Sequence, residues 1–104
     1  MMDSSRWSKF SLYEQMGHIA SEVSRARVWR GRGDEAACNK SIERAFDLVD
    51  LTMADKRWQG RLKETCRFRE LLADQYAATN TYQVSLIDLE RYCMDFALAL
   101  RKTK

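Results

Sequence analysis

Hydrophobic residues recur every three or four positions along most of the chain, which is the spacing of one face of an α-helix. The pattern predicts four amphipathic helices, at about residues 12–30, 34–54, 56–76 and 86–101. Four such helices with short connections fold most simply as an antiparallel four-helix bundle, so we expect an all-α protein. The expected core positions are Leu12, Met16, Ile19, Val23 and Ala26, then Cys38, Ile42, Phe46, Val49 and Met53, then Leu62, Thr65, Phe68, Leu72 and Tyr76, and finally Leu86, Leu89, Cys93, Phe96, Ala97 and Leu100.

Residues at the expected helix ends support these boundaries. Ser11 followed by Glu14 forms a capping-box pattern at the first helix, and Ser85 followed by Asp88 gives a similar start to the last one. Gly31 and Gly33 are expected to end the first helix, since glycine adopts the left-handed conformation that terminates helices. Asp34 is the expected N-cap of the second helix. Gly60 makes the start of the third helix the weakest of these boundaries.

Composition narrows the class of protein. The chain has 104 residues, no proline and four glycines, which suits one domain, residues 1–104, made of long helices. The polar segment 1–10 is expected to be flexible. No apolar run is long enough to span a bilayer and no secretory signal is visible, so we expect a cytoplasmic protein without membrane contact. Cys38, Cys66 and Cys93 are then expected to be three buried free thiols.

No catalytic set is recognisable, and neither an enzyme nor a bound cofactor or metal is expected. His18, the single histidine, has Glu14 and Glu22 four residues to either side. Ordinary contacts on a solvated helix face explain this trio better than a metal site does. Arg69 lies close to the expected core face of the third helix, where Asp47 or Asp50 is its expected partner.

Two surfaces are candidates for binding. Helix 86–101 has a second apolar stripe, about 100° around the helix axis from the core face, and helix 34–54 ends in apolar residues on different sides. Surplus apolar faces suggest a groove for a partner or a dimer seam, although two neighbouring helices of one bundle can also use them. The candidate partner-binding residues are Leu51, Met53, Ile87, Met94 and Leu98.

The second candidate is a basic cluster at the end of the first helix. Guanidinium groups contact phosphates and an exposed indole can stack on bases, so this cluster is the best nucleic-acid-binding candidate in the chain. These side chains point in several directions, and the following helix is acidic, which favours a structural role. The cluster consists of Arg25, Arg27, Trp29, Arg30 and Arg32.

About half of the chain resembles the flagellar export chaperones, which are cytoplasmic helical bundles that cover the apolar segment of an export substrate. The resemblance lies in a helix ending in basic residues, the run 33–36, the run 42–49 and a later helix at 62–76. It implies a chaperone-like role and a protein partner. Our leading expectation is therefore a non-enzymatic helical bundle that binds another protein or itself, and the alternative is an accessory nucleic-acid-binding bundle.

Overall fold

The computed structural model describes residues 4–77 and 85–102, and every regular element in these ranges is helical. The elements are α1 (Ser4–Trp7), α2 (Leu12–Gly31), α3 (Glu35–Met53), the 3₁₀ helix η1 (Lys56–Arg61), α4 (Leu62–Ala77) and α5 (Leu86–Lys102). The all-α prediction is therefore confirmed. Among the described residues, no helix has the length and apolar character needed to cross a membrane.

The capping residues form the contacts that the sequence predicts. The hydroxyl of Ser11 accepts a hydrogen bond from the backbone N–H of Glu14, and the Glu14 carboxylate accepts one from the backbone N–H of Ser11. The side chain of Asp34 accepts from the N–H of Ala37. Gly33 has a φ of 80°, the left-handed conformation that ends a helix and that glycine adopts without strain.

The start of the third helix and the burial of one thiol differ from the prediction. The third helix does not begin as an α-helix at residue 56, because Lys56–Arg61 forms a 3₁₀ helix before α4 starts at Leu62. Cys66 is exposed and only Cys38 and Cys93 are buried, so the expectation of three buried thiols is wrong. Cys66 follows the buried Thr65 on α4, and the next residue of a helix points about 100° away from its neighbour.

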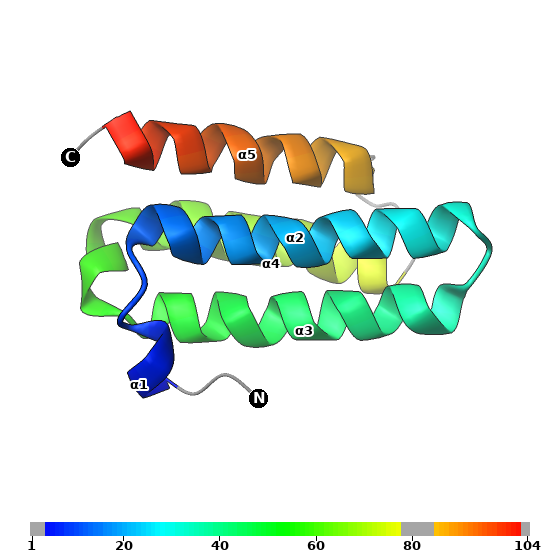
Figure 1. Ribbon diagram of the computed structural model, residues 1–104, viewed down its shortest axis with the longest axis horizontal. Helices are drawn as coiled ribbons and strands as arrows, with labels where there is room; N and C mark the ends of the chain where they lie inside the picture. The colour runs from blue at the N-terminus through cyan, green and yellow to red at the C-terminus, as the bar shows by residue number, and fades with distance from the viewer. Residues whose placement is uncertain (1–3, 78–84, 103–104) are drawn as a thin grey trace.

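Helix α2 lies at the centre of the arrangement. It packs along most of its length against both α3 and α5, which flank it on either side, and α4 lies behind it (Figure 1). Helix α4 contacts α3, and to a smaller extent α5. Side chains from all four long helices are buried together with Trp58 of η1. The predicted core positions are buried or partly buried, apart from Tyr76, which is exposed, and Leu100, whose side chain lies outside the described residues.

Residues 4–10 belong to the segment that is expected to be flexible from its polarity, and in the structure they pack on the other helices. The Trp7 side chain is almost completely buried, and its Nε1 group donates a hydrogen bond of 3.1 Å to Oγ1 of Thr52. Arg57 donates hydrogen bonds to the backbone oxygens of Ser8 and Phe10. These contacts hold the segment against the helices. The Trp7 side chain buries a large apolar surface, and the Arg57 guanidinium donates to the backbone oxygens of Ser8 and Phe10.

Candidate functional site

The outer face of α5 carries a row of exposed apolar side chains. Ile87, Met94 and Leu98 are 48%, 49% and 45% exposed, and their spacing of seven and four residues places them on one side of the helix. The core side chains of the same helix, Leu89 and Cys93, are buried. We call Ile87, Met94 and Leu98 the α5 stripe. The second apolar stripe that the sequence predicts on this helix is thus exposed to solvent.

The two candidate residues of α3 are not part of this stripe. Leu51 and Met53 are partly buried and pack against the hydrophobic core at the end of α3. Helices α3 and α5 lie on opposite sides of α2 in the view of Figure 1. The structure therefore brings together three of the five predicted partner-binding residues.

The arginines of the basic cluster are engaged in contacts within the chain. Nε of Arg27 lies 3.2 Å from Oε1 of Glu90 and joins α2 to α5. Arg30 donates hydrogen bonds of 2.7 Å to the side-chain oxygen of Gln75 and of 3.0 Å to its backbone oxygen, and also lies 3.4 Å from the Glu35 carboxylate. These two side chains tie α2 to its neighbours, which is a structural role.

Arg25, Arg32 and Trp29, the remaining residues of the basic cluster, also form contacts within the chain. Arg25 forms an ion pair of 2.9 Å with Glu22. The guanidinium of Arg32 lies over the Trp29 ring, 5.5 Å from its centroid, in a cation–π contact. Trp29 is partly buried against the core. The cluster thus presents less free positive charge and less indole surface than its sequence suggests.

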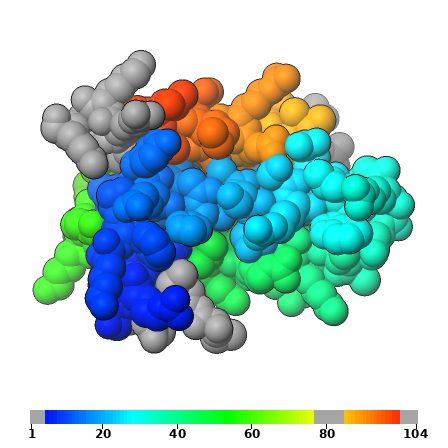
Figure 2. All heavy atoms as spheres, viewed as in Figure 1, coloured from blue at the N-terminus to red at the C-terminus, as the bar shows by residue number. Residues whose placement is uncertain are grey.

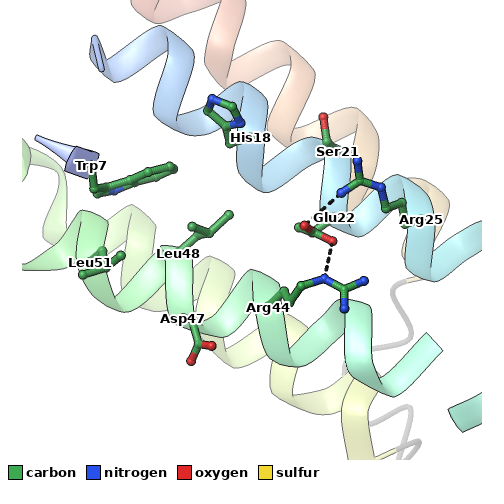
Figure 3. Close-up of a pocket in the computed structure, with 9 residues that line it drawn as sticks. All are labelled: Trp7, His18, Ser21, Glu22, Arg25, Arg44, Asp47, Leu48 and Leu51. Carbon is green, nitrogen blue, oxygen red and sulfur yellow. Dashed lines mark hydrogen bonds and ion pairs between the residues drawn. The ribbon is translucent and has the colours of Figure 1, made fainter. Parts of the chain in front are cut away.

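A cleft of about 670 Å³ lies between α2 and α3, with Trp7 of α1 at one end. Its wall includes the apolar side chains of Trp7, Leu48 and Leu51, and His18 stands beside Trp7 (Figure 3). The His18 ring lies 5.8 Å from the Trp7 ring and 4.7 Å from the Phe10 ring, measured between centroids. His18 is therefore part of an aromatic cluster over the docked N-terminal segment.

The other end of the cleft is charged. The Glu22 carboxylate is nearly buried and lies between two arginines, with Oε2 2.9 Å from Nη1 of Arg25 and Oε1 3.1 Å from Nε of Arg44 (Figure 3). Arg44 also donates a hydrogen bond to the hydroxyl of Ser41. The shared carboxylate joins α2 to α3 and offsets one of the two positive charges inside the protein.

The described parts of the chain contain no group of three His, Cys, Asp or Glu side chains placed to bind a metal ion.

Arg69 pairs with Asp50, one of its two predicted partners, at 2.9 Å. Both side chains are exposed, so Arg69 does not lie at the core face as expected.

The sequence did not reveal the cleft or the polar contacts of the buried Gln15. Gln15 was not assigned a role, yet it is fully buried and connects Trp7, Asp55 and Trp58 through its side-chain amide. The one available signal was the pair Trp7 and Phe10, since large aromatic residues in an otherwise polar segment tend to be buried.

The comparisons with known proteins add no relative, because no protein-family model, no curated protein and no solved structure matches this chain.

Proposed function

We propose that this chain is a non-enzymatic helical protein that binds another protein through the α5 stripe. The observation that carries the proposal is the alignment of three half-exposed apolar side chains on the solvent side of one helix. Exposed apolar side chains gathered in this way are typical of protein interaction surfaces, because their burial removes apolar area from water. Methionine in the middle of the row suits adaptable contacts.

Within this proposal, the four long helices form an antiparallel four-helix bundle that presents α5 at its edge. Contacts between the helices support this topology. Glu22 of α2 pairs with Arg44 of α3, and Arg30 near the end of α2 pairs with Glu35 at the start of α3. Phe68 of α4 stacks on Tyr92 of α5, with ring centroids 5.9 Å apart. A rigid edge helix is a suitable platform for a partner helix.

A cytoplasmic location is also part of the proposal. Cys38, Cys66 and Cys93 are all free thiols, as expected in a reducing compartment. An adaptor or a chaperone-like protein would act there on another cytoplasmic chain.

The test is affinity capture from the cells that make the protein, followed by mass spectrometry. Met94→Asp places a charge in the centre of the α5 stripe. Ala73→Asp is the matched control, because Ala73 is an exposed alanine of α4 and does not belong to the helix that carries the stripe. We expect wild type and Ala73→Asp to retain the same protein and Met94→Asp to lose it, with all three showing equal helical circular dichroism. A partner retained equally by all three would contradict the proposal.

A further inference from the structure

The α5 stripe has charged neighbours whose spacing suits one partner in particular. Arg91 and Asp95 are exposed, and both lie along the same edge of the stripe. They are one turn apart and opposite in charge. Asp88 also lies on that edge but is already engaged at the start of the helix, where its Oδ2 accepts hydrogen bonds from the backbone N–H and the hydroxyl of Ser85. Among the described side chains of this edge, Arg91 and Asp95 are therefore the charges that a partner would meet.

An antiparallel copy of α5 matches this edge. In an antiparallel helix pair related by a two-fold axis, the same edge of each helix faces the other, and residues equally far from the axis lie opposite each other. The register that places Ile87 opposite Leu98 of the second copy brings Arg91 to within one residue, about 1.5 Å along the axis, of Asp95 of the second copy. By symmetry the same pair forms a second time. In a parallel copy related by a two-fold axis, this edge would instead face the opposite edge of the second helix, where Glu90 is already paired with Arg27.

The apolar side chains fit the same register. Ile87 and Leu98 would pack together at both ends of the contact, and Met94 would lie near the axis against the methylene groups of Arg91 of the second copy. On the opposite edge of the stripe, Glu90 of α5 is already paired with Arg27 of α2, so this edge faces α2. Figure 2 shows α5 along one border of the molecule beside α2, and the α5 stripe is exposed to solvent.

We propose that the partner of the α5 stripe is a second copy of this chain, docked antiparallel through α5, with two symmetric Arg91–Asp95 pairs between the copies. This inference rests on the proposed function and names its partner. A contact of one helix face is small compared with the interface of a stable dimer, so the dimer is a weak one that exchanges with the monomer.

Sedimentation velocity over a range of protein concentrations tests the proposal. Met94→Asp is expected to be a monomer throughout, and Ala73→Asp, at an exposed position of α4, is expected to behave as wild type. Arg91→Asp and Asp95→Arg each create two like-charge pairs across the contact and are expected to raise the dissociation constant by about tenfold. The double variant R91D/D95R restores both pairs with reversed sign, and its dissociation constant is expected to return to within about threefold of wild type.

The charge-swap result separates the possible outcomes. Rescue in the double variant supports the antiparallel contact, whereas a double variant as weak as the single ones overturns the assigned register. Circular dichroism of each variant identifies any loss of folding, and the Ala73→Asp control identifies a general effect of added charge. A wild-type protein that stays monomeric at all concentrations overturns the second-copy partner. If wild type then captures a different protein and Met94→Asp does not, the proposed function still holds. If no such protein is captured, both the second-copy partner and the proposed function are overturned.

Discussion

Nε1 of Trp58 donates a hydrogen bond of 2.7 Å to Oε1 of Gln15, and both side chains are fully buried. The amide nitrogen of the same glutamine donates to the backbone oxygen of Trp7 at 2.9 Å and to Oδ2 of Asp55 at 3.1 Å. One side chain of α2 thus satisfies polar groups of the N-terminal segment and of η1. These contacts fix the end of the molecule at which the chain enters α2 and leaves α3.

Replacement of Gln15 by leucine is expected to lower the free energy of unfolding by about 2–4 kcal/mol. Leucine is of similar size but leaves the buried indole N–H of Trp58 and the backbone oxygen of Trp7 without these partners, and each such group costs about 1–3 kcal/mol. Urea unfolding monitored by circular dichroism measures the change. Gln59→Leu, at an exposed position of η1, is the control and is expected to change the midpoint little. Equal midpoints for both variants would show that the Gln15 contacts do not stabilise the fold.

The stability of the protein is expected to fall steeply in acid because of Asp55. Hydrogen bonds from the Arg57 side chain lower the pKa of the Asp55 carboxyl to about 2 in the folded protein, and bonds from the Arg57 backbone N–H and from Gln15 add to this against the opposing effect of burial. In the unfolded chain the pKa is about 3.9. The contribution of the carboxylate is therefore complete above about pH 4 and is lost as the pH falls toward 2.

Thermal unfolding of wild type and Asp55→Asn between about pH 2 and pH 7 checks this expectation. The wild type is expected to be the more stable at neutral pH, and the difference is expected to shrink as the pH falls through the window from about 4 to 2. Asp47→Asn removes an exposed carboxylate of α3 and serves as the control. A difference between wild type and Asp55→Asn that stays constant down to pH 2 would contradict the assignment.

Helix periodicity and capping residues were sufficient to predict the four long helices, because both signals depend on residues close together in the sequence. The α5 stripe was also visible in this way, since Ile87, Met94 and Leu98 belong to one helix. The contact between Gln15 and Trp58 joins residues 43 positions apart, and local periodicity carries no information about it. For the same reason the sequence grouped Leu51 and Met53 with the stripe, although the packing of α3 against the core separates them from it.

The geometry of Arg30 distinguishes a structural role from a nucleic-acid-binding role. Its guanidinium contacts two oxygens of Gln75 and one of Glu35, which a lysine cannot reproduce. We expect Arg30→Lys and Arg30→Gln to lower the stability by similar amounts, about 1–2 kcal/mol, in urea unfolding. We also expect wild type to show no salt-dependent binding of single-stranded oligonucleotides. Full stability of Arg30→Lys together with salt-dependent binding would favour the nucleic-acid alternative.

The proposed partner binds at the α5 stripe, and site-specific photocrosslinking in the cells that make the protein can locate the bound partner. A photoreactive amino acid replaces Met94 in one variant and Glu70, an exposed residue of α4, in the other. We expect a discrete crosslinked product from position 94 and none from position 70, and the mass of that product shows whether the partner is a second copy or another protein. Crosslinking from position 70 with none from position 94 would show that the partner binds elsewhere than at the α5 stripe.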